Sequence, residues 1–131
     1  SGCPCAMGSA VYFLACARRL REPEQKESIA MIIEVTTLHI HPGQNQAFEA
    51  AITQAAQSFI APFPGCLGYS IRRCIEERSQ YVIEIRWKTL EDHMEGFRKS
   101  KVFTAWRAAI GEHFAQAPGT FHYECLEQYS A

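Results

Sequence analysis

The stretch IEIRWKTLEDHMEGFRKSKVFTAWRAAI, residues 83–110, decides the fold class because it joins a strand pattern to a helical pattern. Ile83, Ile85 and Trp87 alternate with charged residues, as in a strand with one apolar face. From residue 90 to about residue 114 the spacing becomes helical. Because the stretch also carries ionisable groups, it indicates where a functional site should lie.

The helical part of this stretch is expected to form two pieces. Ser100 can cap the second piece, because a serine hydroxyl accepts the free backbone N–H groups of a helix start. The apolar residues that follow have three-and-four spacing and should form the buried face of the helix. They are Phe103, Trp106, Ala109, Ile110 and Phe114.

The rest of the chain divides by the same two periodicities and by its turn residues. In chain order the predicted elements are a strand at 31–40, a helix from Gln44 that ends before Pro62, strands at 66–77 and 80–88, the interrupted helix at 90–114 and a strand at 121–129. This is the split βαβ order. It predicts an α+β, ferredoxin-like β-α-β-β-α-β fold, in which a four-stranded antiparallel sheet carries both helices on one face.

The opposite face of the sheet is expected to be mixed in character. On the central strands its predicted residues are Ile33, Glu34, Val35, Val82, Glu84 and Arg86. A large and partly apolar face of this kind usually marks an interface. We therefore predict a homodimer that packs through its sheet faces.

The length of 131 residues corresponds to one domain. Composition changes near Met31, which predicts an N-terminal extension at residues 1–30 and one domain at residues 31–131. The extension contains an apolar run that could form a short helix outside the core domain. It is either genuine or an artefact of start-site choice, in which case Met31 is the natural first residue.

Composition argues against several classes of partner. The formal net charge is -1 and the 13 basic residues are scattered, so we expect no nucleic acid partner. No apolar run approaches the roughly 20 residues of a membrane-spanning helix, so we expect no membrane partner. The apolar run at residues 10–17 lacks a preceding positive charge, which favours a cytoplasmic protein over a secreted one.

Cysteine and motif patterns predict neither a metal nor a nucleotide site. The six cysteines form no CxxC pair, so we interpret them as reduced thiols. The CPC at residues 3–5 and the pair of His39 and His41 lack the further ligands that a metal needs. The sequence contains no GxGxxG, P-loop or GxSxG element.

Three stretches of the sequence together resemble one known family. They are MIIEVTTLHIHPGQNQAFEAA at residues 31–51, WKTLEDHMEGFRKSKVFTAW at 87–106 and PGTFHYECL at 118–126. In this order they resemble the antibiotic biosynthesis monooxygenase (ABM) family, also called YgiN-like quinol monooxygenases, over residues 31–129. The resemblance implies a dimeric ferredoxin-like α+β barrel. It also implies a monooxygenase that oxidises a quinol or polycyclic phenol with O₂ and needs no cofactor.

Haem-degrading members of this family fit the sequence poorly. They carry an Asn in the first strand and an iron-ligating His in the second helix, where this sequence has Thr37 and Arg107. The resemblance therefore argues against haem degradation. His93 or His113 could in principle replace the missing ligand.

Polyketide-oxidising members fit better. Their Trp at the end of the third strand and their Arg on the second helix correspond to Trp87 and Arg107, whereas their strand Asn is replaced by Ile83. We expect Trp87, His93 and Arg107 to be catalytic, with His93 moving a proton and Arg107 stabilising a phenolate. The expected substrate-binding residues are Thr37, Tyr69, Tyr81, Phe103 and Trp106.

Each of these residues also has a purely structural interpretation. Trp87 could be a core residue, as could the two tyrosines. His93 could be an exposed helical residue, and Arg107 could pair with Glu112 on the surface. His122 is expected to point to the open face of the sheet, where a hydrogen bond in the dimer interface is favoured over catalysis.

Three functional hypotheses follow for residues 31–131. The first is the cofactor-independent monooxygenase. The second is a non-enzymatic small-molecule-binding or stress-related dimer, since one fold serves many functions. The third is an isomerase or lyase, which would need a second acid or base near His93, such as Glu91 or Asp92.

Overall fold

The computed structural model describes residues 31–131, so the predicted N-terminal extension lies outside the described residues. The elements are β1 (Ile32–His39), α2 (Asn45–Ala55), the π-helical turn η1 (Ala56–Ile60), β2 (Cys66–Arg73), β3 (Gln80–Trp87), the π-helical turn η2 (Asp92–Phe97), α3 (Lys101–Ile110), the short helical turn η3 (Gly111–His113) and β4 (Gly119–Glu124).

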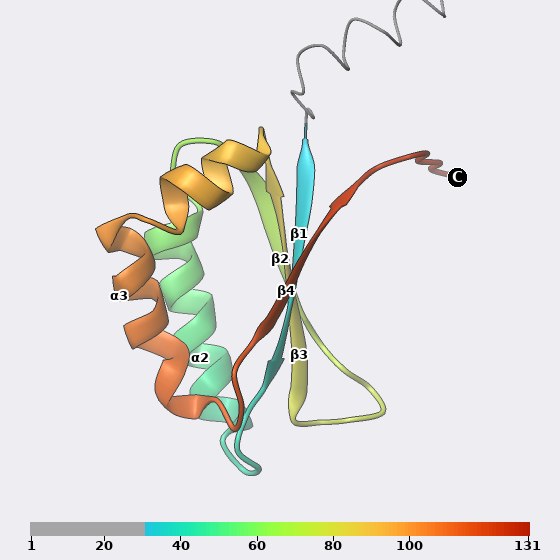
Figure 1. Cartoon of the computed structure of the whole chain (residues 1–131). Helices are drawn as coiled ribbons and strands as arrows, with labels where there is room; N and C mark the ends of the chain where they lie inside the picture. The colour runs from blue at the N-terminus through green and yellow to red at the C-terminus, as the bar shows by residue number, and fades with distance from the viewer. Residues whose placement is uncertain (1–30) are drawn as a thin grey trace, which may run out of the picture.

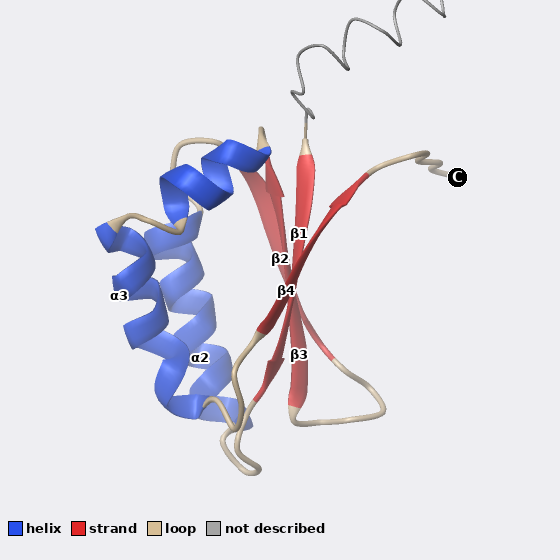
Figure 2. Cartoon of the chain, viewed as in Figure 1, coloured by secondary structure: helices blue, strands red, loops and turns tan. Residues whose placement is uncertain are grey.

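The four strands form one antiparallel sheet in the order β2-β3-β1-β4. Both helices lie on the same side of this sheet, and no element of residues 31–131 lies on its other side (Figure 1, Figure 2). The α+β ferredoxin-like architecture is therefore confirmed. None of the helices within residues 31–131 is long and apolar enough to cross a membrane.

The core fills the space between the helices and the sheet. Alternate residues of β1 and β3 face the helices, and Trp87, at the end of β3, is fully buried. Helix α2 contributes Phe48 and Ile52, whereas α3 contributes Trp106 and Ile110. The predicted break before α3 is confirmed as well, since the Ser100 side chain accepts the backbone N–H of Phe103 at 3.2 Å.

Two strands are shorter than predicted. β2 ends at Arg73, because Cys74 to Ser79 form the connecting loop to β3. β4 ends at Glu124, whose partner in the register is Ile32, the first residue of β1. Beyond that pair β1 offers no backbone partner, so the predicted continuation to residue 129 is wrong.

Two predictions about the faces of the sheet are also wrong. Glu34 lies on the helix side with an exposed fraction of 7%, although we predicted it on the open face beside Val35. His122 is paired with Glu34 in the register and contacts the helix-side residue His93. Glu34 can be buried because three side chains lie against its carboxylate and satisfy its polar atoms. His122 faces the helices because it is paired with Glu34 in the register.

The open face carries exposed aromatic side chains on β4. Phe121 and Tyr123 have exposed fractions of 67% and 53%, and they are paired with Val35 and Ile33 of β1. The face is thus partly apolar, as we predicted from the alternation.

Candidate active site

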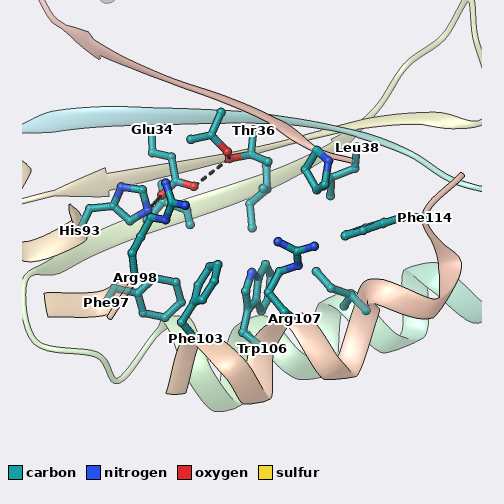
Figure 3. A pocket seen from close by; sticks show the side chains of 15 residues that line it. Glu34, Thr36, Leu38, His93, Phe97, Arg98, Phe103, Trp106, Arg107 and Phe114 are labelled. Carbon is teal, nitrogen blue, oxygen red and sulfur yellow. Dashed lines mark hydrogen bonds and ion pairs between the residues drawn. The ribbon is translucent and has the colours of Figure 1, made fainter. Parts of the chain in front are cut away.

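A cavity of about 260 Å³ lies between the sheet and α3 (Figure 3). One wall is formed by β1, β3 and β4, and the opposite wall by η2 and α3. The lining side chains are Glu34, Thr36, Leu38, Ile83, Ile85, His93, Phe97, Arg98, Phe103, Trp106, Arg107, Ile110, Phe114, Pro118 and Thr120. The aromatic rings thus come from the helix side of the cavity. The polar group, formed by Glu34, Thr36 and Thr120, comes from β1 and β4.

Half of the residues that we predicted for the site line this cavity. His93, Phe103, Trp106 and Arg107 line it directly. Trp87 lies behind this wall, with its ring stacked on the ring of His93 at a centroid distance of 5.2 Å.

The other three predicted residues lie elsewhere. Thr37 alternates away from the helices, and its neighbour Thr36 occupies the lining position. Tyr81 faces the helices as predicted, but its hydroxyl donates to Glu49 at 2.6 Å at the far end of the sheet. Tyr69 packs against the edge of the core and does not line this cavity.

Glu34 is the centre of the polar group. The indole N–H of Trp87 donates to Oε1 at 2.8 Å, and the Thr36 hydroxyl donates to Oε2 at 2.8 Å. The Thr120 hydroxyl in turn lies 2.9 Å from that of Thr36. Burial raises the pKa of the Glu34 carboxyl above its ordinary value, and the hydrogen bonds and the charge of Arg98 offset only part of this effect.

His93 is fully enclosed between Glu34 and His122. Its Nε2 lies 3.2 Å from Oε1 of Glu34, and its Nδ1 lies 2.7 Å from Nε2 of His122. Burial lowers the pKa of His93 to about 3, and His122 and Arg98 act in the same direction. The His93 ring is therefore neutral at pH 7, so one ring nitrogen donates and the other accepts.

Both ring nitrogens of His93 thus already face protein groups. This counts against His93 as a substitute haem ligand. The other candidate, His113, also has a ring nitrogen that faces a protein group, since its Nδ1 lies 2.8 Å from Oε1 of Gln44. Within residues 31–131 no three His, Cys, Asp or Glu side chains lie close enough to hold a metal ion.

The local backbone explains how His93 reaches the sheet. η2 is a π-helical turn whose start is held by Thr89, which accepts the Asp92 backbone N–H at 3.1 Å. The Asp92 side chain packs against Gly65, where an added Cβ would lie 2.5 Å from the carboxyl carbon. Gly65 also has a φ of +91°, so this close approach requires glycine. Single π-turns inside helices frequently occur at functional sites.

Two guanidinium groups lie at the cavity beside the Phe103 ring. Arg98 and Arg107 lie 5.7 and 6.0 Å from the centre of this ring, and Arg107 also lies 5.6 Å from the Phe114 ring. Within residues 31–131 neither guanidinium has a carboxylate at salt-bridge distance, which includes the expected partner Glu112. Both are therefore available to an anionic group in the cavity.

Sequence reasoning missed Glu34, Thr36, Arg98, Thr120 and His122. One signal was present, because the alternation Ile32, Glu34, Thr36, Leu38 places an acid and a hydroxyl on the same face as the apolar residues. A carboxylate at a core-facing position is uncommon and costs free energy to bury, so it indicates a special role.

Sequence comparisons place the chain in the family that the three stretches resemble. Residues 31–109 match the family model described as Antibiotic biosynthesis monooxygenase. The chain is 37% identical over 94 residues to the uncharacterized protein YczJ of Bacillus subtilis (strain 168), and the match covers 72% of this chain and 98% of YczJ.

Solved structures show the same fold. A protein of Bordetella bronchiseptica named for the same monooxygenase family has a TM-score of 0.70 and 35% identity, covering 75% of this chain and 99% of its own. SnoaB, a cofactor-independent oxygenase from Streptomyces nogalater, has a TM-score of 0.64 over 76% of this chain and 96% of its own. Its identity of 16% supports the fold alone.

Proposed function

The chain belongs to the antibiotic biosynthesis monooxygenase family, and we propose that it oxidises a quinol or polycyclic phenol with O₂ without a cofactor. The observation that carries the proposal is an aromatic-walled cavity with a buried carboxylate and imidazole at one end. Aromatic walls suit a flat ring, and the acid–base pair suits removal of a phenolic proton. The volume of about 260 Å³ is at the small end of ligand cavities and favours a substrate of few rings.

The proposed reaction begins with proton transfer from the phenol to the Glu34 carboxylate. The electron-rich phenolate then passes one electron to O₂, and the two radicals combine at a ring carbon. Protonation of the peroxide and loss of water leave one oxygen atom on the substrate as a quinone carbonyl. The substrate supplies all four electrons, so the reaction needs no external reductant.

Each group at the cavity has a role in this scheme. Arg107 and Arg98 would stabilise the phenolate and the peroxide anion, since neither is paired with a carboxylate in the described chain. Trp87 would hold the Glu34 carboxylate in place rather than contact the substrate. His93 would exchange a proton with Glu34 rather than act alone.

A homodimer through the open sheet face is part of the proposal. The face is partly apolar, because Phe121 and Tyr123 are exposed beside Ile33 and Val35. A second copy could cover these side chains. Light scattering after size exclusion should give a dimer for the wild type and a monomer for Phe121→Glu, and a monomeric wild type would contradict this part of the proposal.

Oxygen uptake by metal-free protein tests the proposed activity. A panel of hydroquinones, naphthols and anthrones should contain at least one compound that is consumed faster than in buffer. The variant Glu34→Gln should lower the excess rate by about 10²-fold or more, whereas Glu49→Gln is the matched control at the other end of the sheet. No excess uptake with any compound in the panel would rule out the proposed function.

One observation favours a second candidate, the isomerase or lyase. Such an enzyme needs two acid–base groups within reach of each other, and Glu34 lies 3.2 Å from His93. Exchange of substrate C–H for deuterium in D₂O, without oxygen uptake, would identify this activity. The non-enzymatic hypothesis is disfavoured, since polar groups converge on the cavity.

A further inference from the structure

Three titratable side chains form a continuous row from the cavity toward the outer strand of the sheet. Glu34 and His93 both line the cavity, and His122 follows His93 on β4. The links are 3.2 Å from Glu34 Oε1 to His93 Nε2 and 2.7 Å from His93 Nδ1 to His122 Nε2. Both distances are within reach of proton transfer.

Exposure changes along this row. His93 has an exposed fraction of 1% and Glu34 of 7%, so neither exchanges protons freely with bulk water. His122 is half-buried and lies on β4, an edge strand of the sheet. Its Nε2 faces His93, so Nδ1 is the nitrogen left for exchange with solvent.

We propose that Glu34, His93 and His122 form a proton relay that sets the protonation state of Glu34 from solvent. A proton bound at Nδ1 of His122 is matched by transfer of the Nε2 proton of His122 to Nδ1 of His93. In the same concerted movement the Nε2 proton of His93 passes to Oε1 of Glu34. Release of the proton follows the same steps in reverse.

The relay needs no charged imidazole. While Glu34 is ionised, both histidines carry their proton on Nε2, directed toward the carboxylate. When Glu34 is protonated, both carry it on Nδ1, directed away from it. Uptake from solvent breaks an O–H bond of a hydronium ion and forms the Nδ1–H bond of His122. Each transfer between side chains breaks one N–H bond and forms one N–H or O–H bond, so both rings are neutral before and after.

The electrostatics of the row agree with this scheme. Burial lowers the pKa of both histidines, and Arg98 acts in the same direction. Burial also raises the pKa of Glu34. The other charged group at the cavity is Arg107 on α3. An added proton is therefore held best on Glu34.

The remaining contacts leave the row free to switch. Trp87 donates to Oε1 and Thr36 donates to Oε2, and neither bond occupies a ring nitrogen. By contrast, Nδ1 of His113 faces the amide oxygen of Gln44 at 2.8 Å. An amide oxygen only accepts, so His113 must keep its proton on Nδ1 and is a matched internal control.

Nitrogen-15 NMR of the histidines in the full chain tests the relay without any substrate. As the Glu34 carboxyl carbon titrates, the protons of His93 and His122 should move from Nε2 to Nδ1 on lowering the pH, while His113 keeps its proton on Nδ1. In Glu34→Gln the two tautomers should no longer change. A His93 ring that keeps one tautomer through the titration of Glu34, or that becomes cationic there, would overturn the relay.

The consequence for turnover rests on the proposed function and is measured separately. His122→Ala should lower kcat by about tenfold or more at low buffer concentration, since a proton-transfer group is lost. Added imidazole should restore the rate in proportion to its concentration, which a purely structural role for His122 would not allow. His39→Ala is the control. Unchanged kcat in His122→Ala would overturn the relay, whereas a tautomer switch without any turnover would count against the proposed function alone.

Discussion

Two carboxylates lie at opposite ends of the same helix-covered sheet face, and each accepts a hydrogen bond from an aromatic residue of β3. Glu34 accepts from Trp87 at 2.8 Å, and Glu49 accepts from Tyr81 at 2.6 Å. Glu49 has a side chain that is 38% exposed, forms an ion pair with Arg73, and has its pKa lowered, chiefly by the Tyr81 hydroxyl. Glu34 is buried and has its pKa raised by that burial.

The two clusters, Glu34 with Trp87 and Glu49 with Tyr81, contain similar residues. The difference shows that burial, rather than the type of residue, sets the direction of the carboxyl pKa shift in each cluster. Water and a guanidinium stabilise the charge of Glu49, so it stays ionised and acts as a surface contact. The Glu34 carboxylate is buried, and its hydrogen bonds and the charge of Arg98 offset only part of that burial, so its pKa is raised above the ordinary value. The carboxylate in the cavity is thus the one suited to acid–base chemistry.

Exchanging each carboxylate for an amide should give the largest contrast. Glu34→Gln is expected to lower kcat/KM by about 10²- to 10⁴-fold, because an acid–base group is removed with little change in shape. Glu49→Gln should leave kcat/KM unchanged. Oxygen-uptake kinetics on the best substrate measure both. Equal loss in the two variants would show that the two clusters are not functionally different.

Removing each aromatic donor should separate the clusters by stability. Trp87→Phe is expected to lower the free energy of unfolding by about 1.5 to 3 kcal/mol, since a buried hydrogen bond to a carboxylate is lost. Tyr81→Phe should cost about 1 kcal/mol or less, because water can replace the donor at the more open site. Denaturant unfolding measures both, and a larger loss for Tyr81→Phe would reverse the comparison.

The pH dependence of stability should show that His93 stays neutral. Its folded pKa of about 3 lies below its ordinary value of 6.5, so the unfolded chain binds more protons between these values. Stability should therefore be complete above pH 6.5 and fall as the pH drops, by up to about 1.4 kcal/mol per pH unit for each such proton.

The raised pKa of Glu34 acts in the opposite direction. Its contribution is complete below its ordinary pKa and is lost as the pH rises through the folded pKa. The measurement is therefore made in Glu34→Gln, between pH 4.5 and 6.5, with Glu34→Gln/His93→Asn as the control. His122 contributes with the same sign as His93. An equal slope with and without His93 would contradict its lowered pKa.

The smallest effect is expected at the exposed ion pair. Arg73→Gln should leave the free energy of unfolding close to the wild-type value, since the Arg73 and Glu49 side chains are 40% and 38% exposed. Stability measured at low and high salt should also agree. A clear loss of stability would mean that the exposed cluster, too, is an energetic anchor.

The elements of the fold could be predicted because they depend on neighbours in the sequence. The alternation at Ile83, Ile85 and Trp87 gave β3, and the Ser100 cap gave the start of α3. The ends of β2 and β4 could not be predicted in the same way. They depend on where a partner strand stops, and that partner is distant in the sequence.

Part of the cavity lining was predicted for a related reason. His93, Phe103, Trp106 and Arg107 belong to the same stretch, so their common location follows from one strand-to-helix junction. Thr37 was wrong by one residue as a lining residue, and one residue is enough to move a side chain to the other face of a strand.

The sequence by itself determined the order of strands and helices, the family and the helix that carries the aromatic wall of the cavity. Only the tertiary structure decided which carboxylate contacts His93. Glu91 and Asp92 are its neighbours in the sequence, but Glu34 reaches it from β1 and His122 from β4. Burial and proton exchange depend on such contacts between distant strands, and a local sequence pattern does not contain them.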